Sequence, residues 1–199
     1  MIDPATLNLV RKGEDLCYSL YSSPIGGIYI LGNDAALKAL IFKGSYPGKS
    51  AIGKHFAEAE SGSVRTAKAF LDHYFHGPGR RGSGASLRSQ VKYSLKDSML
   101  FVIFTSAELK LDMSTFTGNE IGVYRELMKV PAGSTVSYGQ LARRSGIPDG
   151  ARFVGNAMAK NNFPIIIPCH RVIKSDGSMG NYSVGIHIKK YLLDHEKKF

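Results

Sequence analysis

The chain has 199 residues, of which 43% are hydrophobic and 21% charged, a globular composition with enough length to bury a core. We expect no secretory leader, because the sequence shows no charged segment followed by an apolar one, and it shows no apolar run of the about 18 residues that a membrane span needs. We therefore expect an intracellular protein with no membrane partner, located in the cytoplasm or, in a eukaryote, in the nucleus. The formal net charge of +10 favours an anionic partner, nucleic acid first.

The two cysteines, Cys17 and Cys169, are far apart in the sequence. This spacing argues against a disulfide framework and against a cysteine-rich zinc site, so we expect no metal. Cys17 lies in an alternating, strand-like segment over residues 16–21, where we expect it to pack in the core. Any thiol chemistry of this chain therefore falls to Cys169.

The first half of the chain predicts a small sheet with helices. Residues 15–43 carry strand patterns separated by turns, and residues 100–104 form a short apolar run typical of a strand. Apolar residues at helical spacing predict helices over 51–60 and 64–75.

A basic, Gly/Ser-rich stretch over residues 79–96 follows the second of these helices. We expect a mobile loop there, for which DNA contact is one reading and a solvated basic surface the other. A polar, unpatterned segment predicts a linker over 112–117. The organisation we expect is thus an α/β N-terminal domain (small sheet plus helices) over 1–111 and a C-terminal domain over 118–199.

Helical patterns dominate beyond the linker. An apolar stripe over residues 121–128 predicts one helix. A capping box at Ser137 and Gln140 begins the next, which we expect to end at Gly146. A further helix is expected over 150–161. Two short helices joined by a tight turn form the helix-turn-helix plan, whose second helix enters a DNA groove.

An Asp-Gly pair at 176–177 predicts a hairpin wing, so we expect a mostly helical, winged helix-turn-helix domain. Residues 129–174 hold seven basic residues against one acid, a net charge of +6. Ala151, Gly155 and Ala159 recur every fourth residue along the second helix. Such a stripe permits close approach to another helix or to a phosphate backbone, and the residues alone favour helix packing.

The run Pro168-Cys169-His170-Arg171-Val172 follows an apolar stretch over 163–167, which predicts a thiol at the end of a buried strand. A cysteine reacts as its thiolate, and a nearby positive charge or base lowers the thiol pKa from about 8.5. His170 can reach Cys169 only if the chain turns there or a water bridges the two side chains. The residues alone favour a plainer reading, a small core cysteine beside a polar histidine.

The last helix is expected over 186–197, with Ile188, Leu192 and Leu193 facing inward. At helical spacing Glu196 projects between the two leucines. A buried carboxylate is unfavourable unless it is paired, and a histidine is the economical partner. The alternative is a frayed terminal glutamate in solvent, and periodicity alone does not separate the two.

Together these residues resemble the O6-alkylguanine-DNA alkyltransferases, also called methylated-DNA–protein-cysteine methyltransferases, whose signature is Pro-Cys-His-Arg-Val after an apolar strand. The resemblance covers nearly all of residues 116–196 at family spacing, whereas residues 1–111 match only in outline. Its other matching residues are Ser137-Tyr138, Gln140-Leu141-Ala142, Ala151-Arg152, Gly155, Ala157-Met158, Asn161, Asn181-Tyr182-Ser183, Gly185, Lys189, Leu192-Leu193 and His195-Glu196.

The resemblance implies direct-reversal DNA repair, in which the alkyl group of O6-alkylguanine, and of O4-alkylthymine, moves irreversibly to Cys169, once per molecule. It implies that Cys169 is the nucleophile, that His170 acts on it through a water, and that Glu196 orients and charges the histidine. Tyr138 would donate a proton to the leaving guanine. Asn161 would brace the turn that carries the thiol.

The resemblance also implies duplex DNA containing O6-alkylguanine as the partner, nucleotide flipping, no cofactor and a monomer. Arg152 would fill the place that the flipped nucleotide leaves. Val184 stands where some members have glycine, and we expect it to narrow the pocket. The expected DNA contacts are Arg152, Ala151, Gly155, Ala159 and Ser137, and the expected base contacts are Met158, Val172, Tyr182, Ser183 and Val184.

The main alternative is a non-catalytic helix-turn-helix DNA-binding protein. Such a protein would share the basic helices but would not need Cys169, His170 and Glu196 together. Alkyltransferase-like binding proteins carry another residue in place of the cysteine. A Cys-His-Glu hydrolase is a third reading, and it would turn over many times where an alkyltransferase stops after one event.

Overall fold

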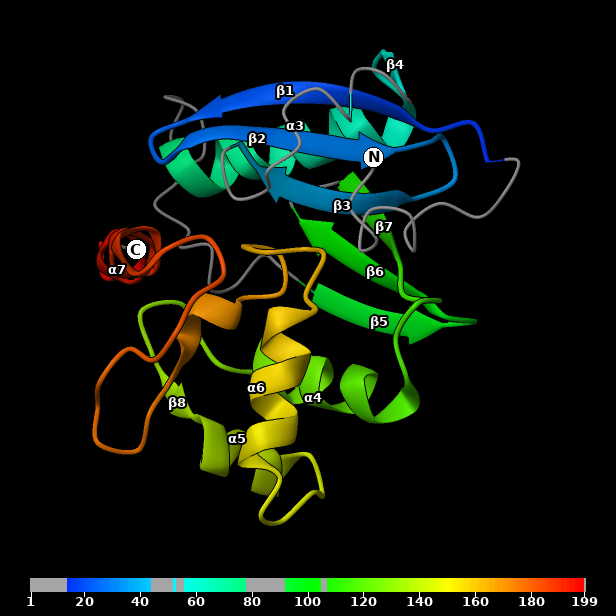
Figure 1. Cartoon of the computed structure of the whole chain (residues 1–199). Coiled ribbons are helices and arrows are strands. Elements are labelled where there is room, and N and C mark those ends of the chain that lie inside the picture. Colours follow the sequence, from blue (N-terminus) through cyan, green and yellow to red (C-terminus); the bar gives the residue numbers. More distant parts are fainter. Residues whose placement is uncertain (1–13, 44–51, 53–55, 78–91, 105–106, 199) are drawn as a thin grey trace. The chain divides into compact units, whose positions relative to one another are not determined.

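The structure is a computed structural model that describes residues 14–43, 52, 56–77, 92–104 and 107–198. The chain divides into unit 1, Met1–Thr115, and unit 2, Phe116–Phe199, and each is described by itself (Figure 1). The roles expected for an N-terminal domain, a linker and a C-terminal domain stay predictions.

Unit 1 is built on a seven-stranded mixed sheet in the order β4-β1-β2-β3-β7-β6-β5. Strands β1, β2 and β3 form one antiparallel set and β5, β6 and β7 form another. A parallel pair, Leu37 with Leu111, joins β3 to β7. The strands are β1 (Cys17–Ser23), β2 (Gly26–Gly32), β3 (Leu37–Phe42), β4 (Ala57–Glu58), β5 (Lys92–Lys96), β6 (Met99–Phe104) and β7 (Ala107–Asp112).

Side-chain hydrogen bonds set the turns between the first strands. The β1–β2 turn contains Gly26 at φ +103°, a conformation that glycine adopts without strain, and Ser23 Oγ donates to the Gly26 carbonyl at 2.6 Å. Before β3, Asn33 Oδ1 accepts from the Ala36 N–H at 3.0 Å. These turns confirm the strand pattern predicted over residues 15–43.

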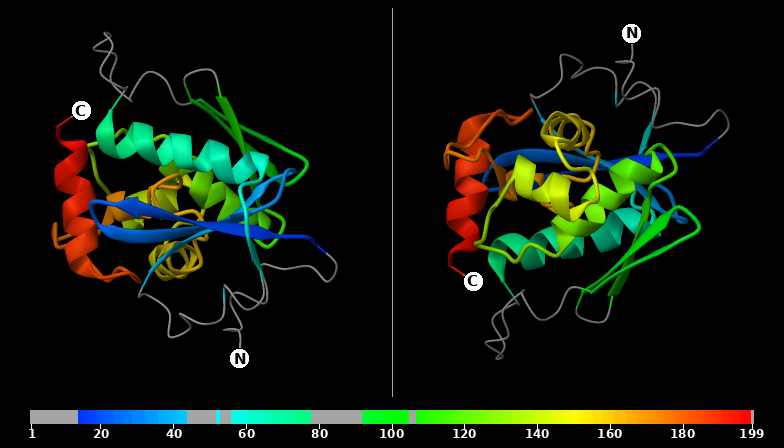
Figure 2. Two further views of the ribbon diagram at one scale, coloured as in Figure 1. Left: turned by 90° about the horizontal axis from the view of Figure 1, so that it is seen from above. Right: turned by 90° about the horizontal axis from the view of Figure 1, so that it is seen from below.

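Helix α3 (Gly62–His76) lies along one face of the sheet (Figures 1 and 2). It buries one stripe of side chains, which includes Phe70 and Tyr74. The helix ends at Gly77, which has φ +74°. The helix expected over residues 64–75 is therefore confirmed.

Two expectations for unit 1 are wrong in part. A helix is expected over 51–60, and Ile52 is helical, with its carbonyl accepting from the Phe56 N–H at 3.0 Å, but Ala57–Glu58 forms β4, because the edge of β1 offers this short segment a parallel partner. Residues 51 and 53–55 lie outside the described residues. The basic stretch is expected to be a loop, but its end, Lys92–Lys96, forms β5 against β6. Residues 78–91 of that stretch lie outside the described residues.

Unit 2 is mostly helical and contains a short parallel pair of strands. The capping box is confirmed, since Gln140 N–H donates to Ser137 Oγ at 3.1 Å and Ser137 N–H donates to Gln140 Oε1 at 2.9 Å. Its elements are α4 (Gly118–Met128), β8 (Val136–Ser137), α5 (Tyr138–Arg144), α6 (Ala151–Ala159), β9 (Val172–Ile173) and α7 (Ile186–Glu196).

The mixed sheet of unit 1 and the helices α3 to α7 confirm the coarse fold class. The winged helix-turn-helix description of unit 2 stays a prediction. Helix α5 ends at Arg144, two residues before the expected end at Gly146. No helix in the described ranges combines the length and apolar character that crossing a bilayer requires.

The apolar run over 163–167 is a buried tight turn, so the strand expected there is wrong. Ile167 N–H donates to the Phe163 carbonyl at 2.8 Å, and Ile165 has φ +74°. Two prolines, one inside the run and one directly after it, have no N–H to give to a strand ladder. The run is apolar because the turn is buried, and not because it belongs to a sheet.

Candidate active site

Cys169 begins a single 3₁₀ turn, Cys169–Arg171, directly after the buried turn. The Cys169 N–H donates to the Ile167 carbonyl at 2.8 Å, and the Arg171 N–H donates to the Pro168 carbonyl at 2.9 Å. The chain therefore turns at the thiol. A turn is one of the two alternatives, the other being a bridging water, that would let His170 act on Cys169. Cys169 is 6% exposed and borders a pocket.

Asn161 holds both ends of the buried turn. Its Nδ2 donates to the Ile167 carbonyl at 2.8 Å, and its Oδ1 accepts from the Phe163 N–H at 2.9 Å. The Ile167 carbonyl thus receives both the Asn161 amide and the Cys169 N–H. This arrangement supports the bracing role expected for Asn161.

Glu196 is fully buried, so the alternative of a frayed terminal glutamate is wrong. Its Oε1 lies 2.8 Å from Nε2 of His170, the expected partner. Arg171 donates to the same carboxylate twice, from Nε at 2.9 Å and from Nη2 at 2.8 Å, and the Gly133 N–H donates at 3.2 Å. The residue patterns did not indicate a role for this bidentate arginine. The sequence feature that could have indicated it is the position of Arg171 directly after His170 in the pentapeptide.

The other ring nitrogen of His170, Nδ1, is buried and has no hydrogen-bond partner among the residues that the structure describes. Burial lowers the pKa of His170, although the hydrogen bond and charge of Glu196 act to raise it. The imidazole is therefore neutral at neutral pH. Glu196 orients the ring but does not hold it charged, and Nδ1 is free to accept a proton.

Burial raises the pKa of the Cys169 thiol. Hydrogen bonds with Asn161 and Tyr182 and the charge of Lys189 act in the opposite direction. The expectation that neighbouring positive charge lowers the thiol pKa is wrong in its net direction, because Cys169 is buried more deeply than a strand end would be. The thiol is protonated at rest, and its proton has to leave as the sulfur reacts.

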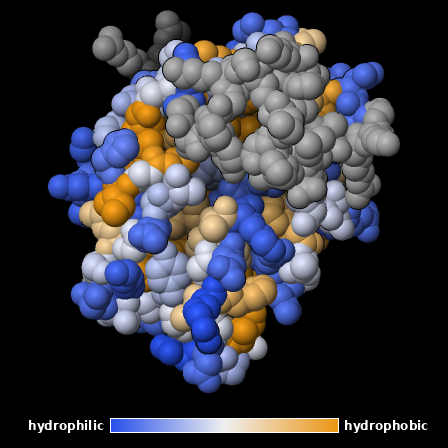
Figure 3. All heavy atoms as spheres, viewed as in Figure 1, coloured by the Kyte–Doolittle hydropathy of each residue, from blue (hydrophilic) through white to orange (hydrophobic). Residues whose placement is uncertain are grey.

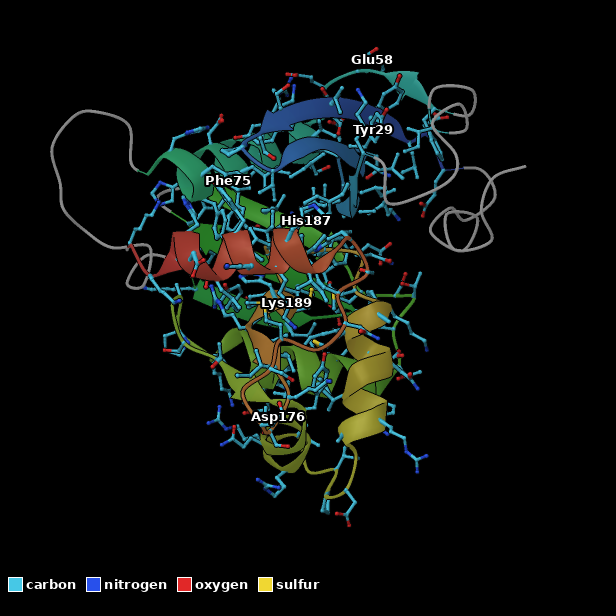
Figure 4. All side chains as sticks on the ribbon, turned by 60° about the vertical axis from the view of Figure 1, so that its left-hand side comes forward. Tyr29, Glu58, Phe75, Asp176, His187 and Lys189 are labelled. Carbon is cyan, nitrogen blue, oxygen red and sulfur yellow. The ribbon has the colours of Figure 1, made fainter. Side chains whose placement is uncertain are left out.

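Lys189 is a fully buried lysine of α7 (Figure 4), and its charge acts on the Cys169 thiol. Its Nζ donates to the Val172 carbonyl at 2.6 Å and to the Met179 carbonyl, and it lies 5.8 Å from the ring centroid of Tyr182. Burial lowers the pKa of Lys189 to about 8. Lys189 is among the residues that match the family, but no role was expected for it. The sequence feature that indicates its inward position is helical spacing, since Lys189 lies seven residues before Glu196 on the inner side of α7.

A pocket of about 1000 Å³ opens beside the thiol, bordered by α5, α6 and the segment after β9. Two basic residues that the sequence analysis did not assign, Arg143 and Lys174, also line it. Within the described residues, no group of three His, Cys, Asp or Glu side chains could hold a metal ion. The expected site residues that line the pocket are Ser137, Tyr138, Ala151, Arg152, Gly155, Met158, Ala159, Cys169, Tyr182 and Ser183.

Two expected base contacts, Val172 and Val184, do not line this pocket. Val172 is fully buried, and its carbonyl accepts from the Lys189 ammonium. Val184 is half-buried, and the structure gives no support to the expectation that its side chain narrows the pocket. The expected catalytic residues His170 and Glu196 also lie outside the lining, in the interior next to the thiol turn.

Tyr138 begins α5 and presents its hydroxyl near the backbone of Gly180. A Cβ atom on Gly180 would lie 3.2 Å from that hydroxyl oxygen, and Gly180 has φ +65°, so glycine is required for this close approach. Burial raises the pKa of Tyr138, and the neighbouring Cys169 adds to the effect. The phenol is therefore protonated at neutral pH and can act as a proton donor in the pocket.

The stripe of small residues on α6 faces the pocket and not another helix. Ala151, Gly155 and Ala159 all line the pocket, and a Cβ atom on Gly155 would meet no described atom within 4 Å. Arg152 is exposed at the start of the same helix. On the face shown in Figure 3, hydrophilic residues gather over α6 and the lower end of unit 2. The helix-packing reading of the stripe is therefore wrong.

Residues 120–198 match the family described as 6-O-methylguanine DNA methyltransferase, DNA binding domain. The human methylated-DNA–protein-cysteine methyltransferase is 50% identical over 74 residues, which make up 37% of this chain and 36% of the human protein. The chain thus matches about a third of the length of that relative.

Two further relatives match along most of the chain. The crystal structure of Mycobacterium tuberculosis OGT in complex with DNA is 28% identical with a TM-score of 0.64, covering 91% of this chain and 92% of that one. The methylated-DNA–protein-cysteine methyltransferase of Methanosarcina acetivorans is 32% identical over 180 residues, which cover 90% of this chain and 97% of the relative. Because this last match covers most of both proteins, the chain belongs to the methylated-DNA–protein-cysteine methyltransferase family.

Proposed function

We propose that this protein repairs DNA by direct reversal, moving the alkyl group of O6-alkylguanine, and of O4-alkylthymine, from duplex DNA to Cys169. One observation carries the proposal. The Cys169 thiol borders a pocket that also presents the phenol of Tyr138 and the small-residue stripe of α6, with the His170–Glu196 pair directly behind it. Membership of the family supports it, since the relatives are named for methylated DNA and a protein cysteine.

In the proposed displacement, Cys169 Sγ forms a bond to the alkyl carbon while the bond from that carbon to O6 breaks. The thiol proton passes through a water to Nδ1 of His170, whose opposite N–H is held by Glu196. Tyr138 gives its proton to the guanine ring, so the base leaves neutral. Solvent then returns a proton to the phenolate and accepts one from the imidazolium, which restores both groups.

The product is a thioether on Cys169. No step of this chemistry removes the alkyl group again, because neither water nor a neighbouring side chain displaces sulfur from an unactivated alkyl carbon. The protein is consumed stoichiometrically, one alkyl group for each molecule. All the residues of the proposed site belong to one chain, so a monomer is sufficient for the reaction.

The lesion oxygen is not accessible inside stacked duplex DNA, so the nucleotide has to be extruded at a cost of a few kcal/mol. Arg152, exposed at the start of α6, is the residue we assign to the place that the nucleotide leaves. Ala151, Gly155 and Ala159 allow α6 to approach the phosphate backbone closely. The solved complex of Mycobacterium tuberculosis OGT with DNA supports a DNA partner for this helix-turn-helix, which we take to be winged.

The test is the intact mass of the protein after incubation with a duplex that contains one O6-methylguanine. We expect every molecule to gain the mass of one methylene, with peptide mapping placing it on Cys169. Cys169→Ala should bind the duplex and gain no mass, while Cys17→Ala should behave like the unmodified protein. A non-catalytic DNA-binding protein would gain no mass, and more than one transfer per protein or alkylation of Cys17 would contradict the proposal.

A further inference from the structure

Tyr124 is a fully buried tyrosine on α4 whose hydroxyl leaves its own helix to bond another. Its Oη donates to the carbonyl of Ala157 on α6 at 2.6 Å. The ring packs edge-on against Phe116, with centroids 5.2 Å apart and planes at 87°. A buried tyrosine that only packs could donate to any nearby acceptor. The particular carbonyl that it bonds therefore indicates which part of the structure the hydroxyl holds.

The Ala157 carbonyl belongs to the last turn of α6, where carbonyl groups run out of partners within the helix. The only backbone N–H that reaches it in the described part of the chain, that of Lys160, is shared with the Asn156 carbonyl, at 3.2 and 3.1 Å. The Tyr124 hydroxyl gives it a second, shorter bond. Tyr124 therefore fixes the C-terminal end of α6 to α4.

A second contact joins the end of α6 to the first turn of α4. One turn before Tyr124, the carboxylate of Glu120 pairs with Lys160 Nζ at 2.7 Å. The lysine side chain is 63% exposed and the Glu120 side chain 5% exposed, so solvent reaches this ion pair at the lysine, whereas both groups of the Tyr124 bond are buried. The tyrosine bond is therefore the fully buried one of the two contacts.

Asn161, which holds the turn before the thiol, is the second residue after the end of α6. Its amide reaches the Ile167 carbonyl, which also accepts the Cys169 N–H. The hydrogen bond between Asn161 and the thiol lowers the pKa of Cys169 against the effect of burial. A small displacement at the end of α6 would therefore weaken a bond that favours the thiolate.

We propose that Tyr124 is a positioning residue for alkyl transfer, which acts through the end of α6 to keep Asn161 bonded to the Cys169 turn. The role rests on the proposed function, because it concerns the reactivity of the same thiol. It adds a residue from α4, an element that does not line the pocket, to the groups that set this reactivity.

The test uses Tyr124→Phe in the full chain, which removes the hydroxyl and keeps the ring. The rate of Cys169 modification by iodoacetamide is followed against pH, well below the melting temperature, in a Cys17→Ala background. We expect the profile to move to higher pH by about half to one unit, the shift that loss of one hydrogen bond of ordinary strength supports. In an Asn161→Ala background the same change should add no further shift.

Two control variants separate positioning from general packing. Lys129→Met removes an exposed lysine from its ion pair with Glu126 of α4, and Tyr191→Phe removes a hydroxyl from a partly exposed tyrosine of α7, so both should leave the profile in place. If Tyr124→Phe does not fold, Phe116→Leu loosens the same ring and should give a smaller shift in the same direction. A lower melting temperature with an unchanged pH profile would show that Tyr124 only packs, and would overturn the inference.

The outcome is independent of the test of the proposed function. If the unmodified protein takes no methyl group from O6-methylguanine in duplex DNA, the proposed function fails, whatever the iodoacetamide profile shows. If transfer occurs and the Tyr124→Phe profile does not move, the proposed function stands and the positioning role fails.

Discussion

Cys169, His170 and Lys189 are all buried, and for each of them the loss of hydration disfavours the charged form. The site therefore does not rest as a thiolate beside an imidazolium. It rests as a thiol beside a neutral imidazole, with Glu196 carrying the fixed negative charge and Arg171 balancing it. In the proposed reaction, charge separates only as the thiol proton moves to His170, so we expect mutations that disturb the orientation of that ring to slow the reaction.

Glu196→Gln tests this orientation. The amide can present its NH₂ group to Nε2 and favour the wrong tautomer, so we expect transfer from O6-methylguanine in duplex DNA to slow by roughly 10²-fold, the low end of a general-base contribution. The pH profile of thiol modification should move to higher pH. Asp194→Asn, on the exposed side of the same helix, is the matched control and should react normally. An unchanged profile in Glu196→Gln would make the glutamate purely structural.

The same carboxylate should make the fold sensitive to acid. Burial alone would raise the pKa of Glu196, but the hydrogen bonds of His170 and Arg171 and the charge of Arg171 hold it well below its ordinary value of 4.5. A carboxyl group whose folded-state pKa is depressed stabilises the fold above its unfolded-state pKa, and this stabilisation is lost as the pH falls toward the folded-state value. The free energy of unfolding should therefore fall below about pH 4.5.

Urea unfolding between pH 7 and pH 3 measures this loss. Glu196→Gln should be less stable at pH 7 by about 3 to 5 kcal/mol, because Arg171 keeps a buried charge without its counter-ion. Its stability should also fall less steeply with acid than that of the unmodified protein. Parallel acid limbs for the two proteins would mean that other carboxyl groups, such as Asp112 or Glu120, account for the acid sensitivity.

Lys189→Met tests the buried positive charge. The ammonium lowers the thiol pKa, so its removal should move the iodoacetamide profile of Cys169 to higher pH and slow the reaction near neutral pH. Lys190→Met, at the next and exposed position of α7, keeps the same change in net charge and should leave the profile in place. Equal shifts in both variants would indicate a long-range charge effect in place of a local one.

At the scale of the element, α6 contributes to two parts of the proposed reaction, contact with DNA and bracing of the thiol turn. Its inner side buries Val154 and Ala157, and its outer side presents Arg152 and the small stripe to the pocket. The helix also leads directly into Asn161 and the thiol turn. In the proposed function, contact with DNA at the start of α6 and bracing of the thiol turn by Asn161 just beyond its end therefore both depend on this nine-residue helix.

Arg152→Ala separates these two properties. Only a duplex requires extrusion of the nucleotide, so repair in duplex DNA should slow far more than reaction with free O6-alkylguanine base. Arg144→Ala removes an exposed arginine of α5 that does not line the pocket, and it controls for the general loss of positive charge. Equal slowing on both substrates would make Arg152 a structural residue of α6.

The elements that the sequence predicted well are those whose ends carry a local signal. The capping box at Ser137 and Gln140 and the stripe of α3 depend on neighbours three or four residues away, which periodicity reads directly. The strand β4 and the turn over 163–167 depend on distant or irregular partners, the edge of β1 and the side chain of Asn161. No local pattern encodes those partners.

The features of the candidate site divide in the same way, into those that a local pattern indicates and those that depend on packing. The inward direction of Glu196 follows from helix periodicity, and its contact with His170 from the cost of burying a lone carboxylate. The second partner, Arg171, and the net rise in the pKa of Cys169 depend on how deeply the thiol turn is buried. Burial depth is a property of packing. The sequence therefore indicated that Glu196 and His170 meet, but not whether the pKa of the Cys169 thiol is raised or lowered.

At the scale of the whole molecule, every residue proposed to act in transfer lies in unit 2, which also contains the match to the DNA binding domain over 120–198. The match to the Methanosarcina acetivorans protein nevertheless covers 90% of the chain and so includes unit 1. If Cys169 takes an alkyl group, as proposed, the stability of unit 2 should change, because the thiol lies in that unit.

Alkylation of Cys169 should destabilise the folded protein. A thioether has no S–H, so the hydrogen bond from Sγ to the Tyr182 hydroxyl, 3.7 Å long, is lost, and the added carbon meets a thiol turn that is 6% exposed at Cys169. Overpacking typically costs about 1 to 3 kcal/mol, against the roughly 5 to 15 kcal/mol that holds a domain folded. We expect the melting temperature of the methylated protein, measured without DNA, to fall by several degrees.

The size of the alkyl group separates the two causes of this fall. Loss of the thiol hydrogen bond is the same for methyl and benzyl groups, whereas overpacking grows with size unless the group extends into the pocket. Because Sγ borders a pocket of about 1000 Å³ that Val184 does not line, we expect both groups to lower the melting temperature by similar amounts. A much larger fall with benzyl would show that the group is forced against the buried turn, and an unchanged value after methylation would show that the thiol hydrogen bonds contribute nothing to stability.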